Sequence, residues 1–505
     1  MTLHTPDTRI AIIGAGPSGL VTARWLLEAG LTPVIFEAAS ALGGHWNSAG
    51  PHSATWPGMR TNTSRVMSAF SDLDHAPGTA VYPRQDQMLD YLHAYAGRFG
   101  LMPHLRLASP VVSMTQAEGG WLLRSTCGGV ESVEHFGRVI IASGRHSKPV
   151  VPQVLGLDSF SGFLGSAHTA AYAGPARFAG ASVLVAGCSI SALEIATDLA
   201  LGGAASVTVA MRKQRYVLPK LIAGVPTDHV MFNRAAALAG EILPPEALAA
   251  GLKSAVLGAS GHPAQFGAAA PDDNIFAAGI SQSQGFLPAV AEGRITTRPW
   301  IDRIEGSRVH FTDGHSATFD AVLFGTGFRR DLPWLAPAVT KALALDVPVA
   351  DLYAESFHPD HDGLAFVGMY DLVGPYLPVL ELQARWVAQV FAGSAVLPTT
   401  TEQRAAILAA RAAPPALPMH ALAVQFARLA GVEPTVARWP DLERALLFGP
   451  LSPASFRLEG PAALPDAAQR SVDAAGAFGR IIRPDYDPDE QGLRNLVLGS
   501  QAAAA

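Results

Sequence analysis

Two segments of this sequence repeat one pattern, in which a short apolar run, a glycine turn, a helical stretch and a second apolar run follow one another. The first is RIAIIGAGPSGLVTARWLLEAGLTPVIFEA, which starts at Arg9, and the second is SVLVAGCSISALEIATDLALGGAASVTVAMRK, which starts at Ser182. A strand, a tight turn and a helix that leads to a second parallel strand make a βαβ unit. Two such units in one chain predict an α/β fold with two Rossmann-like dinucleotide-binding domains.

The first glycine turn follows the pattern G-x-G-x-x-G directly after an apolar run. Gly14 permits the tight bend, Gly16 bares the backbone toward a pyrophosphate, and Gly19 lets the helix pack close to the strand. Glu37 closes the second apolar run, where a carboxylate can accept hydrogen bonds from a ribose diol. The alternative is that these glycines serve packing alone. We predict dinucleotide-binding roles for Gly14, Gly16, Pro17, Ser18, Gly19 and Glu37.

The second turn has Ser189 in place of the middle glycine. Serine keeps the backbone approachable, and its hydroxyl is able to hydrogen-bond a phosphate. The second apolar run of this unit ends in Arg212 and Lys213 instead of an acid, which suits the 2′-phosphate of NADP. A solvated basic strand end is the alternative. We predict NADPH rather than NADH at this turn, bound by Gly187, Ser189, Ser191, Ala192, Arg212 and Lys213.

Composition and charge exclude several other classes of protein. Hydrophobic residues make up 49% of the chain and charged residues 15%, which favours a compact fold over a disordered chain. The formal net charge is −6 and no basic block exceeds the short run MRKQR, so we expect no nucleic-acid partner. Cys127 and Cys188 form no C-x-x-C pair, which excludes a disulfide reductase and a cysteine-built zinc site.

The sequence shows neither a long apolar stretch nor a secretory signal, so we expect no membrane partner and a cytoplasmic location. The run HPDHDG at 358–363 is interpreted as a surface turn, and no metal site is predicted. A buried strand within 319–328, FDAVLFGTGF, is expected to return the chain to the first domain. The Ala/Gly-rich residues 233–272 suggest no role.

Several motifs in a fixed order make the sequence resemble the flavin-containing monooxygenases, a class with two dinucleotide domains that includes the Baeyer–Villiger monooxygenases. The motifs are FEAASALGGHW, RTNTSRVMSAFSD, GCSISA, FDAVLFGTGF, ELQARW and LLFGPLSPASFRLEGP. The resemblance implies FAD at the first turn and NADPH at the second, with the NADP domain inserted into the FAD domain. It divides the chain into a first FAD-binding part (1–160), an NADPH-binding domain (161–318), a returning FAD-binding part (319–450) and a C-terminal extension (451–505).

The resemblance also implies which residues lie beside the flavin. Asn62, in RTNTSR, aligns with the active-site asparagine of the family, although a turn asparagine would suit the same stretch. Further contacts with the cofactors are implied for Gly44, His45, Trp46, Thr61 and Thr326. The polar residues of ELQARW are either neighbours of the site or an ion-paired helix face: Glu381, Gln383 and Arg385.

The family signature between the two domains is altered in this chain. It reads F-x-G-x-x-x-H-x-x-x-Y, with Phe also accepted in the last place, whereas here two extra residues precede the histidine. The corresponding residues are Phe160, Gly162, His168 and Tyr172. We therefore interpret His168 as a structural histidine of the linker and not as a catalytic acid.

By resemblance, NADPH reduces the FAD, the reduced flavin and O2 form a C4a-hydroperoxide, and a soft nucleophile such as an amine, a sulfide or an indole-like compound takes up oxygen. The partners are thus O2 and a small-molecule substrate whose identity the sequence leaves open. One alternative is Baeyer–Villiger oxidation of a ketone, with Arg60 or Arg65 near the flavin. Another is a protein that binds FAD and NADPH without oxygenating anything. A homodimer is one option for the assembly.

Overall fold

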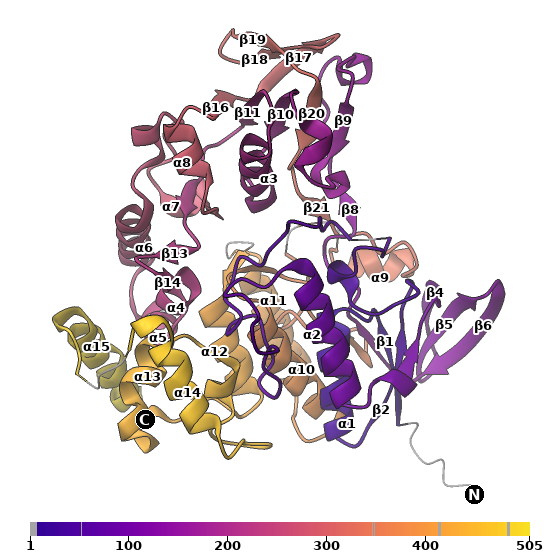
Figure 1. Ribbon diagram of the computed structural model, residues 1–505. Helices are drawn as coiled ribbons and strands as arrows, with labels where there is room; N and C mark the ends of the chain where they lie inside the picture. Colours follow the sequence, from indigo (N-terminus) through magenta and orange to yellow (C-terminus); the bar gives the residue numbers. More distant parts are fainter. Residues whose placement is uncertain are drawn as a thin grey trace, which may run out of the picture.

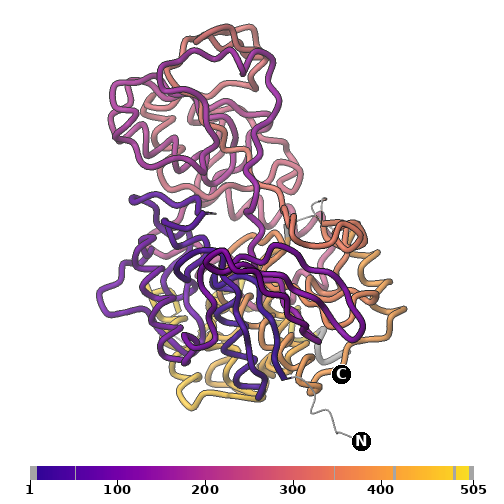
Figure 2. The backbone as a smooth tube through the Cα atoms, turned by 90° about the vertical axis from the view of Figure 1, so that its right-hand side faces the viewer, coloured from indigo at the N-terminus to yellow at the C-terminus, as the bar shows by residue number. Residues whose placement is uncertain are grey.

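The computed structural model describes residues 8–51, 53–345, 347, 349–412, 416–481 and 485–504. The chain forms two lobes (Figure 1). We call the lower one the first lobe, because it contains the N-terminal βαβ unit, and the upper one the second lobe, because it contains the second unit. The backbone tube in Figure 2 shows the same two lobes after a quarter turn.

A five-stranded parallel sheet forms the centre of the first lobe. Its order is β22-β7-β1-β2-β3, and each neighbouring pair is parallel. The strands are β1 (Arg9–Ile13), β2 (Thr32–Phe36), β3 (Leu105–Arg106), β7 (Arg138–Ile141) and β22 (Leu364–Phe366). Ile12 of β1 shares a core with α1 (Pro17–Glu28) and α10 (Leu377–Ala392). The continuous apolar runs in the sequence fit this arrangement, because a parallel sheet is covered on both faces.

The other face of this sheet is covered in part by an antiparallel meander. It consists of β4 (Val111–Ala117), β5 (Gly120–Cys127) and β6 (Val130–Phe136). Trp121 and Phe136 pack in one core with Ile13 of β1. The alternation of buried and exposed residues along β5 is typical of a sheet with one solvated face.

A second five-stranded parallel sheet forms the centre of the second lobe. Its order is β16-β11-β10-β20-β9. The strands are β9 (Gly165–His168), β10 (Ser182–Ala186), β11 (Ser206–Met211), β16 (Ile295–Pro299) and β20 (Ala321–Phe324). One face packs against α3 (Ile190–Leu201) and α8 (Phe286–Ala291). The other face shares a core with an antiparallel meander, β17 (Ile301–Glu305), β18 (Arg308–Phe311) and β19 (Ser316–Thr318).

The position of β20 corrects one expectation from the sequence. This strand does not return to the first lobe, because it lies between β10 and β9, with Leu323 opposite Val185. The chain leaves the second sheet only after Phe324. It then pairs β21 (Phe328–Arg329) with β8 (Lys148–Pro149), so two connections run side by side between the lobes. An apolar run shows that a strand is buried but not which sheet buries it.

The other elements lie around these two sheets. The helices are α2 (Gln85–Arg98), α4 (Thr227–Met231), α5 (Arg234–Ile242), α6 (Pro245–Ser260), α7 (Ile275–Ala278), α9 (Pro337–Ala342), α11 (Thr400–Ala410), α12 (Met419–Leu429), α13 (Glu443–Phe448), α14 (Ala467–Gly476) and α15 (Pro488–Ala504). The short strands are β12 (Tyr216–Leu218), β13 (Leu221–Ile222), β14 (Val225–Pro226), β15 (Ile280–Gln282), β23 (Asp371–Val373) and β24 (Ala416–Pro418).

Much of the Ala/Gly-rich region that suggested no role forms the helices α5 and α6. Helix α5 packs against α12, α13 and α15, on the left of the first lobe in Figure 1. Leu238 and Ala239 of α5 share a core with Leu447 and Val497 from those helices. This region therefore holds a long excursion of the second unit against the C-terminal helices of the first lobe.

Two further results concern only the part of the chain that the structure describes. None of its helices has the length and apolar character required to span a bilayer. No group of three or more His, Cys, Asp or Glu side chains gathers there in the way a metal ion would require. The HPDHDG run forms a turn, in which His361 N donates to His358 O over 3.1 Å.

Candidate active site

The first glycine turn lies between the carboxyl end of β1 and the start of α1, and each glycine meets a specific steric demand. Gly14 has φ of +109°, and a Cβ there would stand 2.6 Å from the Ala142 carbonyl oxygen. A Cβ on Gly19 would stand 1.9 Å from the Gly14 carbonyl oxygen. Both positions thus require glycine to close the turn, whatever binds there.

Gly16 differs, because few atoms of the protein lie beside it. A Cβ on Gly16 would meet only the backbone of Gly44, at 3.4 Å. Gly16 is also the N-cap of α1 and provides no side-chain cap, while Pro17 begins the helix. The first N–H groups of α1 therefore have no side-chain acceptor, which is the arrangement that binds a phosphate.

Glu37 is buried and already accepts two backbone hydrogen bonds. Its Oε2 accepts from Ala15 N over 2.7 Å, and its Oε1 accepts from Ala39 N over 2.8 Å. Each carboxylate oxygen has a second lone pair, so the same group can still accept from a ribose hydroxyl. Glu37 thus holds the turn together and stays available to a nucleotide.

The FEAASALGGHW motif brings His45 and Trp46 next to this turn. Burial lowers the pKa of His45 to about 4, and its Nδ1 is a buried atom with no hydrogen-bond partner in the described structure. The His146 ring lies 6.2 Å from the His45 ring. An orphaned ring nitrogen in a neutral histidine fits a site that a polar cofactor completes.

Asn62 lies on a partly buried loop between the two lobes. The residue before it, Thr61, donates N–H to Pro83 O over 2.9 Å and its hydroxyl to Thr63 O over 2.7 Å. Lys220, from the excursion of the second unit, approaches the Thr61 carbonyl with Nζ at 3.5 Å. The side chain of Asn62 is thus carried by a backbone that both lobes constrain.

The second glycine turn uses a different distribution of small residues. Gly187 has φ of +132°, and a Cβ there would stand 2.4 Å from the Gly325 carbonyl oxygen. Ala192 occupies the place of the third glycine, and it fits because the facing residue is Gly325. The glycine that allows the close approach is thus Gly325, at the end of the neighbouring strand, and not a residue of the helix. In the sequence, the GTG run after β20 was its signal.

The Ser189 hydroxyl caps α3. It donates to the Gly325 carbonyl over 2.9 Å and accepts from Ala192 N over 3.2 Å. A phosphate at this turn would therefore meet backbone N–H groups rather than the hydroxyl proton, which the Gly325 carbonyl already receives. Ser191 is exposed at the same helix start.

A cavity of about 610 Å³ lies beyond the carboxyl end of β11. Arg212, Lys213 and Arg298 line it, together with the chain from Gly267 to Asp272. The Arg212 guanidinium lies 4.6 Å from the centre of the Trp300 ring. Sequence reasoning missed Arg298, because it ends a different strand, β16, and the parallel sheet alone brings it beside Arg212.

The remaining candidate residues lie at different places in the structure. The Thr326 hydroxyl donates to the Val150 carbonyl at the paired connections, which places Thr326 between the lobes. His168 Nδ1 accepts from Ala170 N over 3.0 Å and its ring packs against Phe328, while its Nε2 is buried without a partner in the described structure, so its structural role stays a prediction. Arg60 and Arg65 are both exposed.

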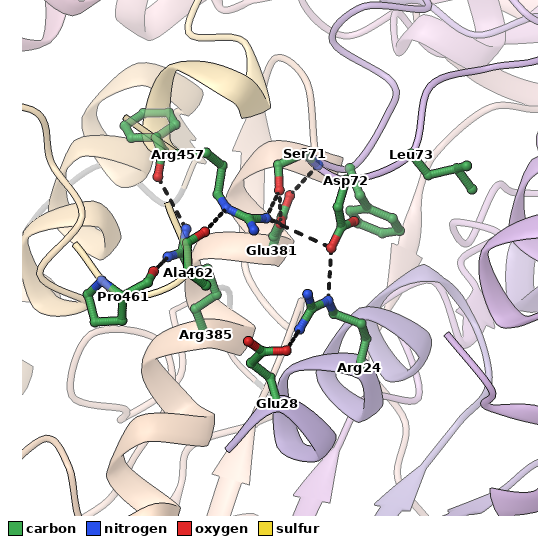
Figure 3. A network of polar contacts seen from close by, with 12 residues as sticks. Arg24, Glu28, Ser71, Asp72, Leu73, Glu381, Arg385, Arg457, Pro461 and Ala462 are labelled. Carbon is green, nitrogen blue, oxygen red and sulfur yellow. Dashed lines mark hydrogen bonds and ion pairs between the residues drawn. The ribbon is translucent and has the colours of Figure 1, made fainter. Parts of the chain in front are cut away.

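The polar residues of ELQARW are buried in the core of the first lobe, and Figure 3 shows the polar contacts around Glu381 and Arg385. Glu381 accepts from Ser71 N over 2.7 Å, and Arg457 approaches its Oε1 at 3.6 Å. Arg24 donates to Asp72 over 2.8 Å in the same network. An ion-paired helix face was one interpretation of these residues; Glu381 instead pairs with Arg457 from outside the helix, and the network is buried.

The fold and these sites define a class: a mixed α/β protein with two parallel sheets, each carrying a small-residue turn at a helix N-terminus. The chain matches the family described as flavin-binding monooxygenase-like over residues 7–483, and it belongs to that family. It is thus a flavin-dependent monooxygenase, and the family agrees with the expected cofactors FAD and NADPH.

Individual relatives agree with this assignment. Flavin-containing monooxygenase 5 of Cavia porcellus is 28% identical over 488 residues, covering 90% of this chain and 89% of that protein. Dimethylaniline monooxygenase (N-oxide-forming) 2 of Oryctolagus cuniculus is 26% identical over 484 residues, with the same coverage.

Solved structures show the likeness of fold. S-allyl-L-cysteine S-oxygenase from Allium sativum has a TM-score of 0.63 at 22% identity and covers 98% of both chains. Cyclohexanone monooxygenase in its open form has a TM-score of 0.62 at 19% identity, over 84% of this chain and 97% of that chain.

Proposed function

We propose that this chain uses FAD and NADPH to transfer one oxygen atom from O2 to a soft nucleophile. The acceptor is the nitrogen of an amine or the sulfur of a sulfide. The observation that carries the proposal is the pairing of two turns with opposite charge beside them. The first has the Glu37 carboxylate, and the second has a cavity lined by Arg212, Lys213 and Arg298. A flavin dinucleotide and a 2′-phosphorylated nicotinamide dinucleotide match these two chemistries.

The first lobe would hold FAD. Its pyrophosphate would approach the backbone between Gly16 and Gly44 and face the uncapped N-terminus of α1. The ribose would meet Glu37, and the orphaned His45 Nδ1 would gain a polar partner. Pro17, Ser18, Trp46 and Thr61 would line the same site.

The second lobe would hold NADPH. The backbone at Gly187 and the start of α3 would receive the pyrophosphate, and the cations of the cavity would receive the 2′-phosphate. When bound and reduced by NADPH, FAD would supply the two electrons that activate O2, so that one oxygen atom goes to the nucleophile and the other leaves as water. Asn62 would hold a hydrogen bond at the place where the two rings meet, and the surrounding lobes would exclude water there.

A ketone oxidation is the second candidate function. The exposed positions of Arg60 and Arg65 give it no support in this structure. The product distinguishes the two functions: an N- or S-oxide indicates oxygenation of a soft nucleophile, and an ester or lactone indicates ketone oxidation.

We propose a division of the chain in which residues 1–160 and the chain after Phe324 bind FAD and residues 161–324 bind NADPH. Residues 451–505 form a C-terminal extension. A homodimer stays a prediction.

The test is a purification followed by a substrate panel. We expect a yellow protein that retains FAD and oxidises NADPH faster with a tertiary amine or a sulfide than with a ketone, with one oxide formed per NADPH. A colourless protein that does not take up added FAD would overturn the proposal.

NADPH recognition has its own test in Arg212→Ala. Loss of one guanidinium from the 2′-phosphate site should raise the KM for NADPH roughly tenfold and leave the KM for NADH unchanged. Arg308→Ala, on the exposed meander, is the control. Equal losses for both nucleotides would remove Arg212 from 2′-phosphate recognition.

A further inference from the structure

The loop that carries Asn62 is held on both sides by one segment of the second unit. Before Asn62, the Thr61 carbonyl faces Lys220 Nζ at 3.5 Å. After it, Ser64 N donates to Asp228 Oδ2 over 2.6 Å, and Ser64 Oγ lies 3.0 Å from His229 Nε2. These contacts join residues about 160 positions apart in the sequence.

The contacts at Ser64 are completely shielded from water. Ser64 and His229 are fully buried, and Asp228 is 2% exposed. A hydrogen bond from a backbone N–H to a buried carboxylate is among the strong ones, because one partner is charged and no water competes. The other carboxylate oxygen of Asp228 has no partner in the described structure, so the hydrogen bond from the Ser64 amide is made by Oδ2.

The anchoring segment is itself fixed at two further points. Lys220 forms an ion pair with Glu194 of α3 over 2.9 Å. Behind α4, the Arg480 guanidinium donates to the His229 carbonyl over 2.7 Å. The helix that begins at the second turn is therefore linked through Glu194 and Lys220 to the residue next to Asn62.

We propose that Asp228 is a positioning residue for Asn62, and that the second unit thereby sets the conformation of the 61–64 loop through the Ser64 amide. Asp228 touches neither cofactor nor substrate in this role; it acts through Ser64 on the backbone two residues from the Asn62 side chain. The functional part of the proposal rests on the proposed oxygenation, whereas the anchoring part stands on the contacts alone.

The first test measures backbone hydrogen exchange in the cofactor-free protein. Asp228→Ala should raise exchange at residues 62–68 by about tenfold or more, while the amide of Thr61, which donates to Pro83 O, should keep its protection. Asp228→Asn retains an acceptor oxygen and should restore most of the protection. Asp90→Ala, which removes an exposed carboxylate from α2, is the matched control.

The second test measures hydrogen peroxide released per NADPH consumed in the FAD-loaded enzyme. Asp228→Ala should raise this ratio and lower kcat with little change in the KM for NADPH, because Asn62 is displaced while the nucleotide sites stay intact. Asp228→Asn should lie between Asp228→Ala and the wild type.

The two tests fail separately. Unchanged exchange at 62–68 in Asp228→Ala would overturn the anchoring role, whatever the enzyme does. Raised exchange with an unchanged peroxide ratio and kcat would overturn the positioning of Asn62. A wild-type protein that consumes no NADPH would overturn the proposed function and leave the exchange result standing.

Discussion

At the scale of single residues, the glycines of the first turn carry unequal constraints. Gly14 and Gly19 are needed to close the turn, since a Cβ at either would collide with backbone. Gly16 has room for a methyl group at ordinary contact distance from Gly44. Packing within the protein does not require glycine there, which fits the proposal that a ligand approaches this backbone.

Gly16→Ala should therefore separate binding from folding. The free energy of unfolding of the apoprotein should change by less than about 1 kcal/mol, while FAD affinity should fall tenfold or more, about 1.4 kcal/mol. Urea unfolding and flavin titration measure the two quantities. Gly97→Ala, in an open part of α2, is the control and should leave FAD affinity unchanged. Loss of stability without loss of affinity would contradict the assignment.

The partly buried His45 beside the first turn predicts a pH dependence. Burial lowers the pKa of His45 to about 4 from 6.5, so the unfolded chain binds more protons than the folded one between these values. Stability is then complete above pH 6.5 and is lost as the pH falls toward 4. At pH 5 the loss from His45 amounts to about 2 kcal/mol.

The measurement is urea unfolding of the apoprotein at pH 7.5 and pH 5.0. His45→Gln, which cannot take up the proton, should make the difference between the two pH values smaller by about 2 kcal/mol. An equal pH dependence in wild type and variant would show that His45 is not buried as a neutral group.

At the scale of elements, the network of Figure 3 joins α1, α10 and the loop that follows Asn62 to the chain after α13. Arg457 and Glu381 have side-chain exposures of only 2% and 3%. Three guanidinium groups surround the Trp25 ring, those of Arg24, Arg385 and Arg457. With so many cations enclosed, the carboxylates are required to balance the charge.

Glu381→Gln should consequently destabilise the protein by about 3–5 kcal/mol, because Asp72 alone then remains to balance the guanidinium groups of Arg24 and Arg457. The comparison is Glu131→Gln, which removes the exposed partner of Arg124 and should cost less than about 1 kcal/mol. Denaturant unfolding with unchanged m-values measures both. Similar effects for the two variants would contradict a special contribution from the buried network.

At the scale of the whole molecule, the two proposed nucleotide sites lie on separate sheets, and the two lobes meet at the 61–64 loop and at two further links. The paired strands β8 and β21 form one link, and the docking of α5 on the C-terminal helices forms another. Each lobe has cores of its own. Ligands should therefore stabilise the lobes selectively.

We expect FAD to slow hydrogen exchange in β1 and α1, and NADP+ to slow it in β10, α3 and residues 267–272. At a free concentration 100 times Kd, each ligand should stabilise its own lobe by about 2.7 kcal/mol. Exchange measured with each ligand alone tests this. Protection by FAD centred on α3 would reverse the proposed division of the chain.

The sequence by itself determined the local units of this protein. Glycine spacing, apolar runs and the basic end of β11 lie within short stretches, where backbone conformation and period follow from neighbouring residues. Both βαβ units, and Arg212 and Lys213 at a strand end, were predictable for that reason. The RTNTSR motif that contains Asn62 is also a short stretch, so the sequence alone was enough to single it out.

Only the tertiary structure decided three features: the sheet that contains β20, the burial of ELQARW in the core, and the contacts that hold the Asn62 loop. Each depends on partners far apart in the chain: Ser64 and Asp228 are separated by 164 positions, and Ser71 and Arg457 by 386. A single sequence carries no period or spacing that relates such residues. These residues come together because whole helices and strands pack against one another. The position of each element is fixed by the close packing of all its buried side chains.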